Sequence, residues 1–340
     1  MNVLRAEQNT LSIPYIEGDG IGPEVVSVAR EVVDNLLKVN WIPISHNDYD
    51  AIKKEGVALK GPLGTPVGTG HRSYNVMMRQ SLDLFACIRP IRWYGNWSPV
   101  SNPQYCDMIV FRENTEDLYA GIEFDAGTQR AKDLCEIYGA KTDSNHTAVG
   151  LKIISENGSK RLMRMACEYA KTHPEYHNHI TIVHKGNIMK YTEGNFRKWC
   201  YDVAQEYPEL KVDDCICDAF LQNSLLSPMK YDIIVTTNLN GDYISDALAA
   251  QVGGVGISPG VNMNNECAVF EATHGTAPDI AGKGLANPCS CVLSAAMMLE
   301  YLGYANEADR IRQAVRKAIH LNSNTTEEYK KNIIYYLNND

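Results

Sequence analysis

The sequence lacks the features of several common protein classes. No run of apolar residues approaches the ~20 that a membrane-spanning helix needs. The first ten residues, MNVLRAEQNT, contain no apolar stretch of the kind found in secretory signal peptides. Positive charge is scarce, because 41 acidic residues outnumber 32 lysines and arginines, and the net charge of −9 argues against nucleic acid or an anionic membrane as a partner. A cytoplasmic protein is therefore expected.

Ten cysteines are scattered along the chain. Without an export signal they are expected to be reduced thiols, many of them buried as small hydrophobic residues. Two Cys-x-Cys pairs, Cys215/Cys217 and Cys289/Cys291, leave zinc open as an alternative. Structural zinc sites usually have roughly two to four residues between their cysteines, so packing in the core is the favoured interpretation.

Short apolar runs alternate with amphipathic stretches, which predicts an α/β protein, and a length of 340 residues favours two domains over one. The predicted strands cover 11–16, 56–60, 84–90, 108–111, 180–183, 233–237 and 268–271. The predicted helices cover 23–37, 73–80, 159–172, 192–206, 243–251, 294–302 and 306–320. The glycine-rich stretch 252–260 is expected to cross between the domains.

Glycines 18, 20 and 22 follow the first predicted strand and resemble a dinucleotide-binding fingerprint. The full Gly-x-Gly-x-x-Gly spacing fails because Pro23 stands where the last glycine belongs. No acidic residue ends a second strand at the expected distance either. The pattern therefore favours a sharp strand-to-helix turn over a Rossmann site.

Three arginines lie where an anionic ligand can collect. Arg89 and Arg112 stand at the ends of predicted strands, and Arg79 shares a helical face with Asn75, four residues earlier. If Ser73 opens that helix, the free backbone N–H groups there attract an anion. Together the arginines can hold two or three carboxylates through bidentate hydrogen bonds, although a single arginine is more often part of a surface ion pair.

Three aspartates, Asp218, Asp242 and Asp246, can form an oxygen-ligand site suited to Mg²⁺ or Mn²⁺. Gly241 is expected to break the preceding strand, which puts Asp242 near a helix start and Asp246 one turn later. From spacing alone the plainer alternative is favoured, in which Asp242 caps the helix and Asp246 meets solvent.

Further polar residues follow predicted strands. Lys185, after the strand at 180–183, is a candidate base, and Tyr119 is a candidate proton donor. The loop of small residues after the strand at 268–271 lets backbone N–H groups approach a phosphate. Asp279 in this loop can accept hydrogen bonds from a ribose and would repel a 2′-phosphate.

Read together, six long motifs resemble the isocitrate/isopropylmalate dehydrogenase family of β-decarboxylating dehydrogenases, over about 13–318. They are IPYIEGDGIGPEV, GPLGTPVG, RENTEDLYAGIE, VHKGNIMKYTEG, NLNGDYISDALAAQVGG and FEATHGTAPDIAG. The resemblance is strongest to bacterial-type isocitrate dehydrogenases. It implies a two-domain α/β fold without a Rossmann domain, forming a homodimer in which the partner chain completes each cleft. The implied large domain is 1–84 with 253–340, the small domain is 85–116 with 158–252, and a dimer clasp is 117–157.

The same resemblance implies roles for individual residues. Tyr119 and Lys185 correspond to the catalytic acid and base, and Asp218, Asp242 and Asp246 to the metal ligands, with Asp218 and Lys185 supplied across the dimer. The implied substrate contacts are Ser73, Asn75, Arg79, Arg89 and Arg112. The implied cofactor contacts are Leu63, Thr65, Asn187, Glu271, His274, Gly275, Thr276, Ala277, Asp279, Ile280 and Asn287.

The expected reaction is the NAD-dependent oxidative decarboxylation of isocitrate to 2-oxoglutarate and CO₂, a step of the tricarboxylic acid cycle. The stretch RSYNVMMRQ resembles the isocitrate branch, in which Ser73 and Asn75 would meet the third carboxylate. Another 3-substituted malate (homoisocitrate, isopropylmalate or a phosphonate analogue) and a non-catalytic regulatory subunit remain as alternatives. The chain departs from the family at a shortened segment near 41–51, at Gly64, and in the tail after 320, where Lys330 alone keeps a charge suited to a phosphate.

Overall fold

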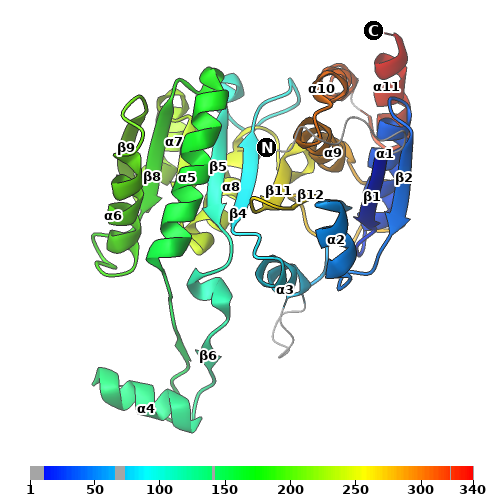
Figure 1. The fold of residues 1–340 in the computed structure, drawn as a ribbon. Coiled ribbons are helices and arrows are strands. Elements are labelled where there is room, and N and C mark those ends of the chain that lie inside the picture. Colours follow the sequence, from blue (N-terminus) through cyan, green and yellow to red (C-terminus); the bar gives the residue numbers. More distant parts are fainter. Residues whose placement is uncertain (1–10, 66–72, 140–141, 322, 340) are drawn as a thin grey trace.

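The computed structural model describes residues 11–65, 73–139, 142–321 and 323–339, and ten of its strands form one sheet. Their order across the sheet is β2-β1-β3-β12-β11-β4-β5-β10-β8-β9 (Figure 1). The strands are β1 (Leu11–Ile16), β2 (Val39–Pro43), β3 (Val57–Lys60), β4 (Ala86–Ile91), β5 (Met108–Glu113), β8 (His179–His184), β9 (Lys211–Ile216), β10 (Ile233–Thr236), β11 (Pro259–Met263) and β12 (Ala268–Ala272).

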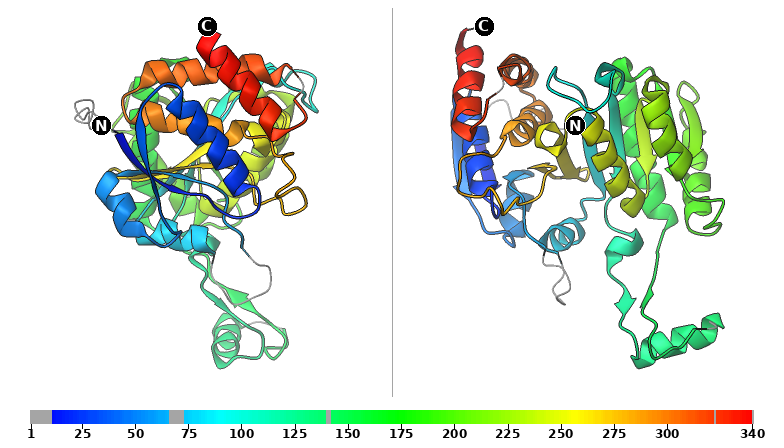
Figure 2. Two further views of the ribbon diagram at one scale, coloured as in Figure 1. Left: turned by 90° about the vertical axis from the view of Figure 1, so that its right-hand side faces the viewer. Right: turned by 180° about the vertical axis from the view of Figure 1, so that it is seen from behind.

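The helices pack on both faces of this sheet (Figure 2). They are α1 (Gly22–Asp34), α2 (Tyr49–Glu55), α3 (Tyr74–Ser81), α5 (Glu156–Thr172), α6 (Glu193–Ala204), α7 (Cys217–Leu226), α8 (Asn238–Gln251), α9 (Cys289–Tyr301), α10 (Ala305–Ile319) and α11 (Thr326–Asn339). Short 3₁₀ turns are η1 (Pro103–Tyr105), η2 (Asp117–Ala120), η3 (Pro174–Tyr176), η4 (Pro228–Lys230) and η5 (Val255–Ile257). No helix among the described residues is long and apolar enough to cross a membrane.

The sheet consists of two parallel groups that run in opposite directions. One group is β2-β1-β3-β12 and the other is β5-β10-β8-β9, and the strands β11 and β4 between them are antiparallel to both neighbours. Strand pairing puts Lys60 opposite Glu271 and Glu271 opposite Gly260. A Cβ on Gly260 would lie 3.7 Å from Cγ of Arg89 on β4, so charged residues of β3, β12 and β4 meet at the centre of the sheet.

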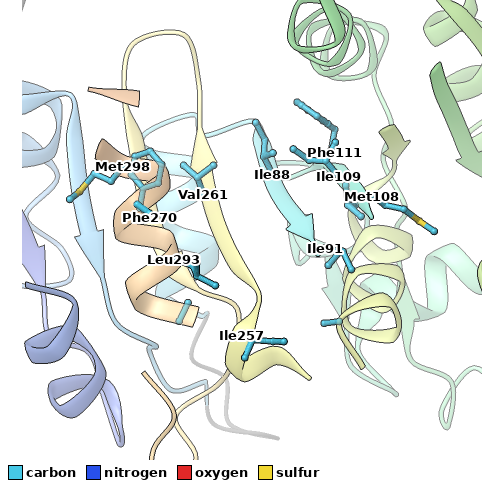
Figure 3. Packing of buried hydrophobic residues seen from close by; sticks show 14 of the residues in the cluster. Ile88, Ile91, Met108, Ile109, Phe111, Ile257, Val261, Phe270, Leu293 and Met298 are labelled. Atoms are coloured by element: carbon cyan, nitrogen blue, oxygen red, sulfur yellow. The ribbon is translucent and has the colours of Figure 1, made fainter. Parts of the chain in front are cut away.

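The apolar core is continuous across this junction. One buried cluster extends from α9 over β12 and β11 to β4 and β5, as Figure 3 shows for Leu293, Phe270, Val261, Ile88 and Phe111. The predicted domain boundary falls between β11 and β4, where this core does not stop. The division into domains stays a prediction.

The segment predicted as a clasp extends away from the sheet. It contains β6 (Glu123–Phe124), α4 (Gln129–Tyr138) and β7 (Val149–Gly150), and α4 lies at its far end (Figure 1). On α4, Ile137 and Tyr138 are 82% and 83% exposed. Large apolar side chains are rarely this exposed unless a partner covers them.

Most predicted elements are confirmed, and β1 has the predicted bounds. Pro23 lies at the start of α1, whose inner face is buried and consists of Val25, Val26, Ala29, Val32 and Val33. The predicted start of one helix is wrong, because α8 begins five residues before it. The predicted helices did not include α11 in the tail. The stretch 252–260 leads from α8 into strand β11, and its role as a crossing between domains stays a prediction.

All ten cysteines are free thiols. Cys289 and Cys291 begin α9 and are fully buried in the core, which confirms the packing interpretation for this pair. Cys215 and Cys217 are half-buried between β9 and α7.

Candidate active site

Three arginine side chains converge beside α8. Arg79 is on α3, Arg89 on β4 and Arg112 on β5, and they are 8%, 7% and 1% exposed. Burial lowers the pKa of Arg112, and the positive charges of Arg79 and Arg89 lower it further. Three guanidinium groups that repel one another in a desolvated place form a site prepared for an anion with several negative charges.

Arg112 is fixed by the first turn of α8. Its Nε donates to the carbonyl of Asn238 at 2.8 Å, and a terminal nitrogen donates to Oδ1 of Asp242 at 2.5 Å. A Cβ on Gly241 would lie 2.5 Å from Cγ of Arg112, so only glycine lets the guanidinium stem approach the helix this closely. Gly241 therefore does not break an element as predicted; it lies inside α8 and makes room for Arg112.

Tyr119, on η2, points at the same aspartate. Its hydroxyl donates to Oδ2 of Asp242 at 2.7 Å, and the guanidinium of Arg112 lies 4.8 Å from the ring centroid. Burial raises the pKa of Tyr119, so the phenol stays protonated at neutral pH. An open depression of about 280 Å³ is lined by Tyr119, Ser73 and Val76, which brings the predicted proton donor and a predicted substrate contact together.

Asp242 and Asp246 lie one turn apart on α8, and each faces an arginine. A nitrogen of Arg89 is 3.3 Å from Oδ1 of Asp246 and donates to Oγ of Ser245 at 2.6 Å. Burial raises the pKa of Asp246. Burial also acts to raise the pKa of Asp242, but Arg112, the Tyr119 hydrogen bond and Arg89 together lower it. The capping alternative for Asp242 is excluded because the residue lies inside the helix. The Asp242 side chain is partly buried and that of Asp246 is 59% exposed, so the solvent-facing alternative holds for Asp246. Two carboxylates one helical turn apart with open oxygens still fit a divalent cation such as Mg²⁺ or Mn²⁺.

Lys185 and Asp218 lie apart from this cluster. Lys185 follows β8, Asp218 is on the first turn of α7, and the ammonium group of Lys185 donates to the Asp218 carboxylate. Asp218 is exposed, and among the described residues no three His, Cys, Asp or Glu side chains are grouped as metal ligands. One chain therefore does not bring Asp218 to Asp242 and Asp246.

The other predicted substrate contacts lie at the start of α3. Ser73 precedes the helix, and its Oγ accepts from the Thr65 hydroxyl at 2.9 Å. Asn75 accepts from the ammonium group of Lys60 at 3.0 Å and donates to the carbonyl of Leu63 at 3.3 Å. The motif residues 66–68 and Arg72, which lie between Thr65 and Ser73 in the sequence, are outside the described residues.

Lys60 is a site residue that sequence reasoning missed. It is 2% exposed and lies 2.5 Å from Oε2 of Glu271, whose other oxygen is 3.5 Å from Arg79. The positive charges of Lys60 and Arg79 outweigh burial and hold the pKa of Glu271 at about 2. The sequence signal for this buried residue is that a lysine ends the otherwise apolar strand VALK. Glu271, predicted to contact the cofactor, is thus held within the arginine and lysine network.

The loop after β12 packs against the glycine-rich turn after β1. The carbonyl of Thr276 accepts from Ile21 N at 3.0 Å, and a Cβ on Gly20 would lie 2.0 Å from that oxygen. The carboxylate of Asp19 accepts from Gly64 N at 2.7 Å, which joins the predicted contacts Leu63 and Thr65 to the same turn. This confirms that the glycines serve a tight turn.

The remaining predicted cofactor residues are distributed unevenly. Burial lowers the pKa of His274, whose Nε2 is buried without a partner among the described residues. Gly275, Ala277, Asp279 and Ile280 follow on the same loop, where Ala277 has a φ of 41°. Asn287 accepts from Cys289 N at 2.9 Å at the start of α9, and Asn187 lies across the sheet in the turn after Lys185.

The arrangement of arginines and aspartates coincides with a sequence match over nearly the whole chain. The model of the isocitrate/isopropylmalate dehydrogenase family matches residues 12–334. The chain belongs to this family. Isocitrate dehydrogenase [NADP] of Streptococcus salivarius is 47% identical, over 90% of this chain and 87% of that protein. The enzyme of the same name from Streptococcus mutans is 46% identical, over 94% of this chain and 91% of its own length.

A solved structure confirms the predicted fold. The isocitrate dehydrogenase of Methylococcus capsulatus is similar with a TM-score of 0.86 and 35% identity, covering 96% of this chain and 99% of that one. The resemblance inferred from the motifs is thereby confirmed at the level of family and fold.

The prediction of NAD as cofactor is wrong by the same comparison. Relatives from Streptococcus, Helicobacter pylori and Staphylococcus aureus, 42–47% identical, are named isocitrate dehydrogenase [NADP]. The prediction depended on one carboxylate, Asp279, which is exposed on its loop, so water and salt screen its charge. Lys283, four residues later, is also exposed and adds a positive charge that the prediction did not consider. Lys330 lies between Glu31 and Glu327, at 3.1 and 2.8 Å.

Proposed function

We propose that the protein oxidises and decarboxylates isocitrate, with NADP as the hydride acceptor and Mg²⁺ or Mn²⁺ as the metal. The observation that carries the proposal is the pairing of the buried Arg89 and Arg112 with the two carboxylates of α8, with the buried Arg79 close enough for its charge to lower the pKa of Asp242. The names of relatives at 42–47% identity support the substrate and the cofactor.

The substrate is a trianion, and this protein carries a net charge of −9, so binding needs a local reversal of charge. The three buried arginines supply it, and each can hold one carboxylate through paired N–H groups. Ser73 and Asn75, at the start of α3, would meet the carboxylate that distinguishes isocitrate from an apolar 3-substituted malate.

Asp242 and Asp246 of this chain would hold the metal, with Asp218 from a partner chain as a further ligand. The metal supplies a Lewis acid that polarises the hydroxyl and the neighbouring carboxylate of the substrate. Arg112 and Tyr119 keep the Asp242 carboxylate oriented, because each donates to one of its two oxygens.

Two groups of the protein would move protons. Lys185, as the neutral amine, would accept the hydroxyl proton as the alcohol becomes a ketone, and NADP when bound would supply the hydride acceptor. The resulting β-keto acid loses CO₂, and Tyr119 gives its phenolic proton to the carbon that loses the carboxylate. Burial favours this role, since it keeps the phenol protonated.

The separation of Lys185 and Asp218 from the arginine cluster supports a homodimer with shared sites. Large apolar side chains are exposed on the segments that carry this pair: Leu226, at the end of α7, is 72% exposed and Ile188, in the turn after Lys185, is 69% exposed. We propose that this surface and the clasp contact a second copy, which brings Lys185 and Asp218 to the partner's Asp242.

Initial rates of NADPH formation with Mn²⁺ test the proposal across isocitrate, homoisocitrate and isopropylmalate. We expect isocitrate to have a kcat/KM at least about 100-fold higher than the others, because its third carboxylate fills a polar site built to hydrogen-bond it. A higher value for isopropylmalate would contradict the proposal, and so would a lack of turnover with all three.

A further inference from the structure

Two fully buried carboxylates share one lysine behind the proposed active site. The ammonium group of Lys152 lies 2.5 Å from Oδ1 of Asp117 and 2.8 Å from Oε1 of Glu193. Asp117 and Glu193 are 0% exposed, and Lys152 itself is largely buried. Charges this deep in a protein are retained only where their partners hold them in good geometry.

Asp117 connects the turn that carries Tyr119 to α8. It is two residues before Tyr119 and has a φ of 68°, in the left-handed region that is uncommon for residues other than glycine. Its carboxylate accepts from Leu239 N, in the first turn of α8, at 2.9 Å. The same carboxylate accepts from Leu118 N at 2.8 Å.

Glu193 connects the turn that carries Lys185 to the same helix. Its Oε2 accepts from Lys185 N at 2.9 Å and from the side-chain amide of Asn240 at 3.1 Å. Its Oε1 accepts from the Thr237 hydroxyl at 2.9 Å, just before α8 begins. Glu193 thus fixes the backbone of the proposed base relative to the helix that carries Asp242 and Asp246.

Lys152 lies on neither of these turns. It follows β7 in the part of the clasp (117–157) that leads back to α5, so its place depends on how the clasp rejoins the body of the protein (Figure 1). Asp117 N also donates to the carbonyl of Ile153 at 2.8 Å, which ties the turn of Tyr119 to this returning segment a second time.

We propose that Lys152 is a positioning residue through which the clasp holds the turns of Tyr119 and Lys185 in register with α8. The inference rests on the proposed function. Since Lys185 of one chain would serve the partner's cleft, the network of Lys152, Asp117 and Glu193 joins groups that belong to two different active sites. Assembly of the clasp then sets the geometry of both active sites.

A double-mutant cycle on the full-length protein tests this role. Lys152→Met and Glu193→Gln each lower kcat, by about 10- to 100-fold for displacements on the order of 1 Å, and leave KM for NADP unchanged. The double variant loses no more than the worse single variant, because both changes break one network. Lys160→Met is the matched control, since Lys160 forms a surface pair with Glu156 on α5 at 2.5 Å, and it keeps wild-type kcat.

A second readout does not depend on catalysis. Hydrogen exchange of the Lys185 and Leu239 amides accelerates in Lys152→Met and stays slow in Lys160→Met, whatever the substrate of the enzyme is. If Lys152→Met folds too poorly, Lys152→Gln serves in both assays. Unchanged kcat with unchanged exchange of these amides overturns the inference, and so do additive losses in the cycle. Failure of the wild type to turn over isocitrate, with exchange as expected, overturns the proposed function alone.

Discussion

Both oxygens of the Asp242 carboxylate are held by residues from outside its helix: Tyr119 donates to one at 2.7 Å and Arg112 donates to the other at 2.5 Å. A single carboxylate therefore joins the proposed proton donor, a substrate-binding cation and the proposed metal site. A substitution at any of the three should therefore alter the geometry of the other two.

Tyr119→Phe should separate the two halves of the reaction. Without the phenolic proton, kcat for isocitrate falls by about 100-fold or more. Reduction of the β-keto acid oxalosuccinate by NADPH keeps most of its rate, because that half-reaction needs no proton on carbon. Stopped-flow absorbance at the nicotinamide band measures both rates, and an equal loss in both would contradict the role given to Tyr119.

Gly241→Ala should damage substrate binding and stability together. The added Cβ would meet Arg112 at 2.5 Å, and displacing this buried guanidinium costs about 1–3 kcal/mol of folding free energy. KM for isocitrate rises as Arg112 leaves its place. Gly256→Ala is the control, because its Cβ would find no atom closer than 3.8 Å. Urea unfolding and initial rates check both effects, and equal behaviour of the two variants would refute the close-packing argument.

His179 should make stability depend on pH. It lies between Asp232 and Asp213, at 3.1 and 3.0 Å, and the hydrogen bond to Asp232 raises the pKa of His179 although burial opposes it. A pKa raised in the folded state means that the stabilisation is complete below the unfolded value of about 6.5 and is lost as pH rises through the folded pKa. His179→Asn therefore lowers the urea midpoint more at pH 6 than at pH 9.

The control for this effect is His146→Asn. His146 pairs with Asp143 at the surface and is 83% exposed, so its removal should leave the midpoint nearly unchanged at both pH values. A larger loss at pH 9 than at pH 6 for His179→Asn would contradict the charged pairing.

Asp279→Asn should improve the use of NADP. Removing one exposed negative charge near the proposed 2′-phosphate raises kcat/KM for NADP by about 2- to 5-fold, the range of a surface ion pair, and leaves the value for NAD unchanged. Added salt should shrink the difference. Equal gains with both cofactors would show that Asp279 does not face the phosphate.

Shared active sites can be tested by complementation. Tyr119→Phe and Lys185→Met should each be nearly inactive, whereas subunit exchange between them restores activity. At equal mixing half of the dimers are mixed and one of their two sites is intact, so about one quarter of the wild-type rate returns. No recovery after verified exchange would place both residues in the same cleft.

The sequence predicted the fold, because the fold depends on local pattern and on long motifs; the roles given to the site residues stay predictions. Strand β1, the inner face of α1 and the arginines at strand ends follow from apolar periodicity and from the placement of charge beside it. The family followed from the six motifs, which extend over most of the chain.

What the sequence could not supply depends on contacts between distant segments. The buried lysines Lys60 and Lys152 look like ordinary surface residues until the sheet and the clasp bring Glu271, Asp117 and Glu193 to them. The sequence alone favours a break at Gly241. Its actual role is hidden because Arg112, which it contacts in space, is more than a hundred residues away in the sequence. The cofactor prediction failed for a related reason, since one exposed carboxylate does not determine the field around a phosphate.

The most direct test of the account measures CO₂ and NADPH together, with isocitrate and Mn²⁺, and repeats the assay with NAD and with a chelator. The account predicts one CO₂ for each NADPH, a higher kcat/KM for NADP than for NAD, and no turnover once the metal is removed. NADPH formation without CO₂, or full activity in the chelator, would contradict it.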